Sequence, residues 1–194
     1  MARTRQYDDL AARQGLVGAF LNKGYTATSL SELEAASGLD RRQLYNGYGD
    51  KKALLKQALE DFAEEAQQVY LGPLFADQAG LKEIRDLLMF FVDASVEPRG
   101  RLGCLVCNTA RETVATDPEI KPHMDRFFGL IEEGYAHALS CAAARGEIDM
   151  DDEMIRRKSR LLFSTHVSLC VLARAVTDQA TLRDMAEETY AALT

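Results

Sequence analysis

The side chains with the most distinctive chemistry in this chain lie close together, between Thr28 and Lys51. Arg can form paired hydrogen bonds with guanine, and Gln or Asn with adenine, in the major groove of DNA. Hydroxyl and ammonium groups can bind phosphate oxygens, which fixes the register of a protein on the duplex. We expect base contacts from Arg41, Arg42, Gln43 and Asn46, and phosphate contacts from Thr28, Tyr45 and Lys51. Double-stranded DNA is the partner that these residues indicate.

A helix, a sharp turn and a second helix are expected to position these side chains. Ser29 is a suitable N-cap for the first helix, and Glu32 completes a capping box with it. Gly38 can adopt the positive φ that ends this helix, and Asp40 can cap the next one. Leu44 would anchor the second helix to the core and leave its polar side chains outward. The pattern fits a helix that enters the major groove, but also an ordinary surface hairpin with a solvated basic face.

The stretch from residue 24 to residue 55 resembles the DNA-binding domain of the TetR family of transcriptional regulators. The shared motifs are Gly24-Tyr25, Thr28-Ser29, Ala36-Ser37-Gly38-Leu39, Leu44-Tyr45-Asn46-Gly47-Tyr48 and Asp50-Lys51-Lys52-Ala53-Leu54. The chain departs from the family at Glu34, where a small Ala is usual, and at Gly47, where an aromatic residue is usual. The resemblance implies an all-α protein. An N-terminal three-helix helix-turn-helix domain would span residues 1–50, and a larger helical ligand-binding and dimerisation domain residues 51–194.

The function that the resemblance implies is one-component transcriptional regulation, with repression as the family default. A homodimer would bind a palindromic operator and be released by a small molecule or an electrophile. In the family, the helix that begins near Lys51 couples ligand binding to the DNA-binding head, and the last two long helices pack with their symmetry mates. The interface residues expected on one helical stripe are Leu162, His166, Leu169 and Ala173. The alternative is that this stripe belongs to the core of a single chain.

The distribution of charge suits a DNA-binding N-terminus despite the net charge of −7. Residues 1–56 hold nine Lys and Arg and six Asp and Glu, whereas residues 57–194 hold 14 and 24. The basic excess therefore accompanies the motif, and attraction to phosphate is local. The chain has no apolar run of membrane-spanning length, and its first residues lack the apolar core of a signal peptide. We expect a cytoplasmic protein that does not enter a membrane.

Hydrophobic periodicity and helix-ending residues predict further helices along the chain. Their expected ranges are 7–22, 51–69, 81–96, 103–114, 117–145, 151–176 and 180–193. The ranges 87–92 and 161–176 are apolar on nearly every face, which predicts burial on most sides. Aromatic and sulfur-containing side chains could line an effector pocket, or simply be core. The candidates are Phe91, Cys107, Met124, Phe128 and Phe163.

Cys104 and Cys107 form a Cys-x-x-Cys sequence next to Arg99 and Arg101. A thiol near a helix N-terminus and basic residues can have a lowered pKa and react with oxidants or electrophiles. Some TetR-like regulators sense electrophiles in this way, so Cys104 and Cys107 are candidate redox sensors. They could equally be small core residues. A zinc site would need further ligands at suitable spacing.

The chain has no sequence motif of an enzyme. No nucleophile elbow, phosphate-binding loop or His-Glu-x-x-His sequence occurs in it. We therefore expect no catalytic residues, no bound metal and no cofactor. Two alternatives to a regulator stay open: a small-molecule enzyme on a helical scaffold, and a helical ligand-binding adaptor that no longer binds DNA specifically.

Overall fold

The computed structural model describes residues 2–175 and 178–193, with side chains from residue 9 onward. Over these ranges the chain forms nine α-helices and no β-strand, which confirms the all-α prediction. The chain divides into two compact units. The first unit comprises Met1–Glu65 and Cys104–Arg126, and the second comprises Ala66–Gly103 and Phe127–Thr194. The functional domains 1–50 and 51–194 stay a prediction, because the compact units divide the chain at other residues.

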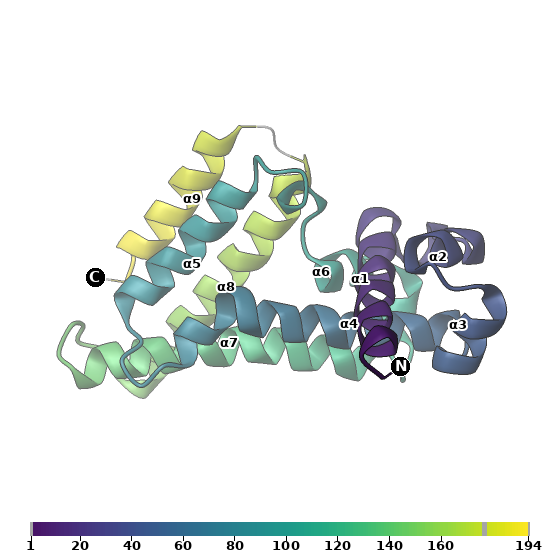
Figure 1. The fold of residues 1–194 in the computed structure, drawn as a ribbon. Helices are drawn as coiled ribbons and strands as arrows, with labels where there is room; N and C mark the ends of the chain where they lie inside the picture. Colours follow the sequence, from purple (N-terminus) through teal and green to yellow (C-terminus); the bar gives the residue numbers. More distant parts are fainter. Residues whose placement is uncertain (1, 176–177, 194) are drawn as a thin grey trace. The chain divides into compact units, whose positions relative to one another are not determined.

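The first unit contains the helix-turn-helix (Figure 1). Its elements are α1 (Ala2–Ala27), α2 (Leu30–Ser37), α3 (Arg41–Tyr48), α4 (Lys51–Ala66, up to Glu65), α6 (Leu105–Thr109), the short η4 (Thr113–Thr116) and the start of α7 (Lys121–Ala144). Helix α1 packs against both α2 and α6. The core of the first unit is formed by fully buried side chains, among them Leu16, Phe20, Leu33, Leu44 and Leu54.

The caps of α2 and α3 follow the local sequence. Ser29 and Glu32 form the predicted capping box at the start of α2. Gly38 ends this helix with φ 69°, and its amide donates to the Glu34 carbonyl. Asp40 caps α3 as expected. Each cap satisfies backbone groups that the helix end leaves unpaired, so the turn between α2 and α3 is set by neighbouring residues.

Helix α1 is interrupted at Gly24. Its helical backbone extends beyond the predicted end at residue 22, but Gly24 has φ 82° and ψ 173°. These angles lie far from those of an α-helix, so Gly24 separates a last helical turn, residues 25–27, from the body of α1. We call this feature the Gly24 break.

The second unit contains the C-terminal helices. Its elements are η1 (Gln67–Leu71), η2 (Gly72–Phe75), α5 (Leu81–Ala94), η3 (Gly100–Leu102), α7 from Phe127 onward, α8 (Asp152–Ala175) and α9 (Gln179–Ala191). Helices α5, α8 and α9 lie side by side (Figure 1). Element η1 is a π-helical turn directly after α4, where a continuous α-helix to residue 69 was predicted.

Several predicted helix boundaries were wrong. The helix expected over 103–114 is only Leu105–Thr109, followed by η4, and α7 begins at Lys121 instead of residue 117. Phe90 on α5 is 40% exposed and Leu161 on α8 is 41% exposed, whereas other apolar side chains of both helices are buried. In the single chain each of these helices therefore keeps one face uncovered. No helix in the described ranges is long and apolar enough to cross a membrane.

Candidate functional site

Helix α3 presents the predicted base-reading side chains on its outer face. Leu44 is buried at 1% exposure and fixes the helix to the core. Tyr45 is 42% exposed, and the other polar residues before and after Leu44 are exposed as well. The exposed residues are Arg41, Arg42, Gln43, Tyr45 and Asn46. The structure therefore brings five of the seven predicted DNA contacts together on one short helix.

Glu34 of α2 is close to the first residue of α3. Its Oε2 lies 3.5 Å from Nη2 of Arg41. The departure from the TetR pattern at this position thus gives an ion pair across the helix-turn-helix, where the family usually has a small side chain. Arg41 is mostly exposed, and exposed ion pairs contribute less than about 1 kcal/mol. Arg41 can exchange this partner for a base or a phosphate at little cost.

Gln43 has a structural role that the sequence analysis missed. Its Oε1 accepts a hydrogen bond from the Asp40 amide at 2.9 Å, and Asp40 Oδ1 accepts from the Gln43 amide at 2.8 Å. This reciprocal pair is a capping box, and the Asp-x-x-Gln spacing could have indicated it. That Gln43 binds adenine stays a prediction. To bind a base, the Gln43 side chain would have to give up its hydrogen bond to the Asp40 amide.

The predicted phosphate contacts differ in exposure. Thr28 is buried at 1% exposure, and its hydroxyl donates to the Gly24 carbonyl at 2.6 Å. A contact between the Thr28 hydroxyl and phosphate would therefore require this bond to break. Lys51, at the start of α4, places its Nζ 4.6 Å from the centroid of the Tyr25 ring. This cation–π contact holds the ammonium group near the end of α1.

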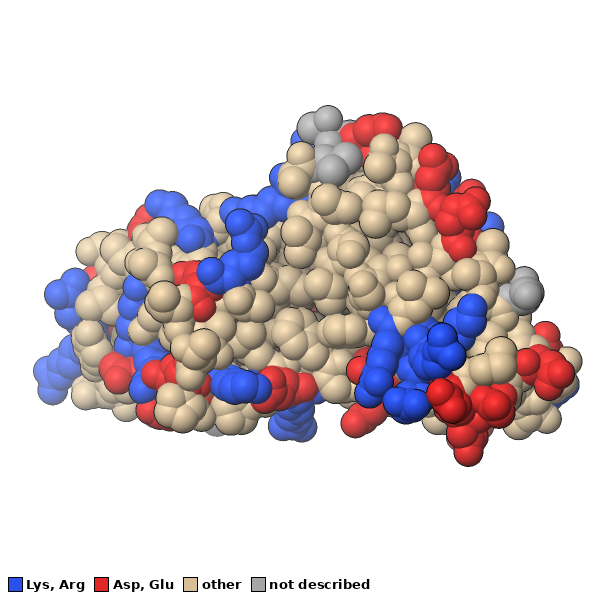
Figure 2. Space-filling view, turned by 180° about the vertical axis from the view of Figure 1, so that it is seen from behind, with Lys and Arg blue, Asp and Glu red and all other residues tan. Residues whose placement is uncertain are grey.

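Two other lysines of α4 are neutralised within the first unit. Lys52 Nζ is 3.3 Å from Asp117 and 2.5 Å from Glu119, and Lys56 Nζ is 3.2 Å from Glu119. The hydrogen bonds to Glu119 and Asp117 raise the pKa of Lys52. Basic and acidic side chains are also intermixed on the face shown in Figure 2. The acidic excess of residues 57–194 is therefore not a uniformly acidic surface on that face.

The five predicted effector-binding residues do not gather in one unit. Phe91, Phe128 and Phe163 belong to the second unit, whereas Cys107 and Met124 belong to the first. Phe128 and Phe163 meet edge to face, with ring centroids 5.6 Å apart. Effector binding by this set of five residues stays a prediction.

His166 is buried in the second unit and has aromatic side chains around it. Its ring centroid is 4.3 Å from that of Phe91 and 6.4 Å from that of Tyr70. The Tyr135 hydroxyl lies 3.3 Å from His166 Nδ1. Burial lowers the pKa of His166 to about 3, so the imidazole is neutral at physiological pH. Gln67 Oε1, in the π-helical turn, is buried without a hydrogen-bond partner among the described residues.

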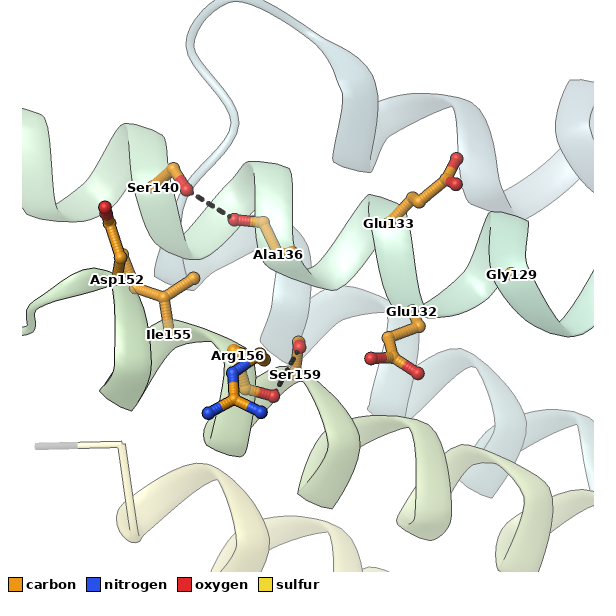
Figure 3. A pocket seen from close by; sticks show the side chains of 9 residues that line it. All are labelled: Gly129, Glu132, Glu133, Ala136, Ser140, Asp152, Ile155, Arg156 and Ser159. Atoms are coloured by element: carbon orange, nitrogen blue, oxygen red, sulfur yellow. Dashed lines mark hydrogen bonds between the residues drawn. The ribbon is translucent and has the colours of Figure 1, made fainter.

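An open groove lies between α7 and α8 in the second unit (Figure 3). It has a volume of about 420 Å³. The lining residues are Gly129, Glu132, Glu133, Ala136, Ser140, Asp152, Ile155, Arg156 and Ser159. None of the predicted effector-binding residues is among them. Within the described residues, no group of three or more His, Cys, Asp and Glu is arranged to hold a metal ion.

Comparison with known proteins identifies the fold. No protein-family model matches the chain. It is 28% identical, over 95% of both chains, to the uncharacterized HTH-type transcriptional regulator YezE of Bacillus subtilis (strain 168). It is also 27% identical to the HTH-type transcriptional repressor DhaR of Mycobacterium sp. (strain GP1), over 66% of this chain and 62% of that protein.

Solved structures of TetR-family regulators superpose on nearly the whole chain. A cysteine mutant of the TetR-family regulator CifR, complexed with operator DNA, has a TM-score of 0.83 at 19% identity, covering 94% of this chain and 95% of that one. A TetR regulator from Chloroflexus aurantiacus has a TM-score of 0.83 at 23% identity, with 97% and 95% covered. The chain has the TetR-family fold. In this fold α2 and α3 are the helix-turn-helix, and the relatives that share it are transcriptional regulators rather than enzymes.

The two cysteines of the Cys-x-x-Cys sequence lie at the start of α6 of the TetR fold. Cys104 is the N-cap residue, and Cys104 and Cys107 are 4% and 5% exposed. Burial alone would raise the pKa of the Cys104 thiol. Hydrogen bonds from the Cys107 thiol and from the amides of Cys107 and Val106 instead lower it. The lowered pKa agrees with the predicted effect of a helix N-terminus, but it comes from these hydrogen bonds and not from Arg99 or Arg101. Redox sensing by Cys104 and Cys107 stays a prediction, and both thiols are shielded from solvent.

The four predicted dimer-interface residues lie in the core of the second unit. Leu162, His166, Leu169 and Ala173 are between 0% and 7% exposed. A second chain could not contact their side chains without repacking this unit. The outer face of α8 instead carries the exposed Met154 and Leu161, which border a hollow of about 440 Å³ together with Arg157 and Lys158.

Proposed function

We propose that the chain is a TetR-like one-component transcriptional regulator, a repressor by the default of its family, that binds palindromic operator DNA in the cytoplasm. The observation that carries this proposal is the outer face of α3. A buried Leu44 fixes the helix, and the exposed Arg42, Tyr45 and Asn46 project from it. A short helix of this kind can enter the major groove with its side chains against base edges.

The exposed residues of α3 would divide into base-reading and phosphate-binding groups. Arg42 and Asn46 are exposed and carry the hydrogen-bonding groups that pair with guanine and adenine. Tyr45 and Lys51 would donate to phosphates and set the register. Arg41 would join either group after it leaves Glu34. Gln43 contributes in this scheme mainly through the cap of α3.

We predict different effects for Arg42→Ala and Tyr45→Ala. Arg42→Ala should weaken binding to the operator about ten- to a hundredfold, with a smaller loss on random DNA. Tyr45→Ala should weaken binding to both by a similar factor. The measurement is a gel shift with DNA from upstream of the protein's own gene and its neighbours, with random DNA as competitor. Arg85→Ala, which removes an exposed Arg of the second unit, is the matched control.

Two outcomes would contradict this function. The absence of any salt-sensitive, sequence-specific shift in the unmodified protein would favour an adaptor or an enzyme instead. Equal losses on operator and random DNA for both variants would contradict the division of roles.

We infer that the DNA-binding form is a homodimer that uses the outer faces of α8 and α9. The exposed Met154 and Leu161 offer apolar area on α8, and the stripe through Leu162 is already covered within the chain. A twofold dimer reads two half-sites about one helical turn, or a multiple of it, apart. Sedimentation of the complex should therefore give two chains for each palindromic site.

Release from DNA would follow the binding of an apolar small molecule or an electrophile. The second unit has an aromatic region around Phe91 and His166, and aromatic side chains of this kind suit a flat, mostly apolar ligand. Such a ligand changes operator affinity only if it binds the free and DNA-bound conformations with different affinities.

We predict that an electrophile acts through Cys104. Treatment with N-ethylmaleimide should reduce operator affinity about tenfold or more in the unmodified protein, because an adduct on a buried thiol forces α6 to repack. Cys104→Ser should abolish this response. Cys141→Ser is the matched control, because Cys141 is more exposed and lies on α7, 3.8 Å from His137. A response that persists in Cys104→Ser and disappears in Cys141→Ser would contradict the assignment.

A further inference from the structure

The Gly24 break is bridged by two side chains from a distant part of the sequence. Asn108 Nδ2 donates to the Leu21 carbonyl at 3.3 Å. The Tyr25 amide donates to Glu112 Oε1 at 2.7 Å, and the Thr26 amide to Glu112 Oε2 at 2.7 Å. In an uninterrupted α-helix the Leu21 carbonyl would accept from the Tyr25 amide. Asn108 and Glu112 therefore supply hydrogen bonds in place of those that α1 loses at Gly24.

Gly24 leaves space for this carboxylate. Its φ of 82° lies in the region that favours glycine. A Cβ atom at this position would be 2.7 Å from Glu112 Oε1, closer than real contacts allow. Glycine is therefore required both for the backbone angle and for the close approach of the carboxylate.

The electrostatics of the site favour a charged Glu112. Burial alone would raise the pKa of this carboxyl group. Hydrogen bonds from the Thr26 side chain and amide and from the Tyr25 amide, together with the nearby Lys51, lower it. A carboxylate that accepts from two backbone amides at the start of a helical turn makes strong, charge-assisted hydrogen bonds. The contact is thus an anion site on the last turn of α1 that the chain fills with its own side chain.

The position of the bridge connects it to the helix-turn-helix. Thr26 is four residues before Leu30, the first residue of α2, and the Thr28 hydroxyl holds the Gly24 carbonyl. Asn108 and Glu112 lie on the segment Cys104–Arg126, which belongs to the first unit but is joined at both ends to the second. A change in the second unit that shifted this segment would act on the chain just before α2.

We propose that Glu112 is the positioning residue of the DNA-binding head. It sets the direction in which the chain leaves α1 for α2, and with it the fit of α3 to an operator. This inference rests on the proposed DNA-binding function for its effect on affinity. The bridge itself can be tested without DNA.

The experiment compares Glu112→Gln with Glu119→Gln in the full chain. Both variants remove one negative charge from the same segment, so the two proteins have the same net charge. Glu119 pairs with lysine side chains of α4, whereas Glu112 binds backbone amides. We expect Glu112→Gln to lose protection from hydrogen exchange at the Tyr25 and Thr26 amides. Its preference for operator over random DNA should fall about ten- to a hundredfold, the range of charge-assisted hydrogen bonds.

Measurements are made below the thermal transition, on protein whose helical circular dichroism matches that of the unmodified chain. A purely structural role would lower the melting temperature and leave the operator preference of the folded protein unchanged. If Glu112→Gln does not fold, Glu112→Asp takes its place, since it keeps the charge but is too short to reach both amides. Unchanged exchange at the two amides, or equal operator preference in the Glu112 and Glu119 variants, would overturn the proposal. If the unmodified protein shows no specific binding to an operator, the proposed function itself is rejected.

Discussion

Gly15→Ala is expected to destabilise the protein by about 3 kcal/mol and to abolish operator binding near the growth temperature. A Cβ atom on Gly15 would lie 1.9 Å from the Ala36 carbonyl oxygen and 2.6 Å from its carbonyl carbon. Both are backbone atoms of α2, so no side-chain rotation can relieve the overlap. Helices α1 and α2 would have to move apart, and α3 would lose its support.

Gly18→Ala is the control for this prediction. Apart from the backbone of α1 itself, no atom lies within 4 Å of a Cβ at Gly18, one turn further along the same helix. Alanine should stabilise α1 there by up to about 1 kcal/mol, since glycine disfavours helix interiors. Denaturant unfolding of the two variants measures the difference. Similar stabilities would mean that α1 and α2 do not approach each other as closely as described.

The second large effect concerns pH. The unfolding free energy should fall by about 2 kcal/mol between pH 6.5 and about pH 5 because of His166 alone. Burial lowers the pKa of His166 from 6.5 to about 3 in the folded protein. In this range the unfolded chain takes up a proton that the folded chain does not. The stability is therefore complete above pH 6.5 and is lost as the pH falls toward 3.

The measurement is urea unfolding at several pH values in the unmodified protein and in His166→Gln. The variant should lose most of the slope between pH 6.5 and 5, whatever its absolute stability. His123→Gln, a half-buried histidine 3.4 Å from Glu60, is the control. Carboxylates such as Glu32, whose pKa is lowered to about 2 by Lys23 and Ser29, should contribute mainly below this window. An unchanged slope in His166→Gln would show that the imidazole is accessible to protons in the folded state.

Much of the helix-turn-helix could be predicted from the sequence because its determinants are local. The capping box at Ser29, the turn at Gly38 and the cap at Asp40 each depend on residues within four positions of one another. Leu44 could be assigned to the core from helical spacing alone. The exposed row on α3 follows from these elements, since a helix with one anchored face turns its other side chains outward.

The features that the sequence analysis missed depend on contacts between distant residues. Glu112 lies 87 positions from Tyr25, and no local pattern marks a glutamate that will bind amides there. His166 fits an interface stripe by periodicity, yet it is buried within one chain. Helical spacing reveals which face of a helix is apolar, but not whether the same chain or another one covers it. The π-helical turn after α4 likewise has no sequence signature.

The discontinuity of the first unit has a consequence for biosynthesis. Residues 1–65 emerge from the ribosome before Cys104–Arg126. The hydrogen bonds of Asn108 and Glu112 to the end of α1 therefore cannot form until this later segment has been synthesised. Domains generally fold as whole units during synthesis, and here the first unit cannot close until the segment Cys104–Arg126 has been synthesised. Exchange of DNA-binding heads between related proteins at residue 50 would therefore separate the head from the segment that finishes it. A functional chimera would have to carry both segments of the first unit, residues 1–65 and Cys104–Arg126.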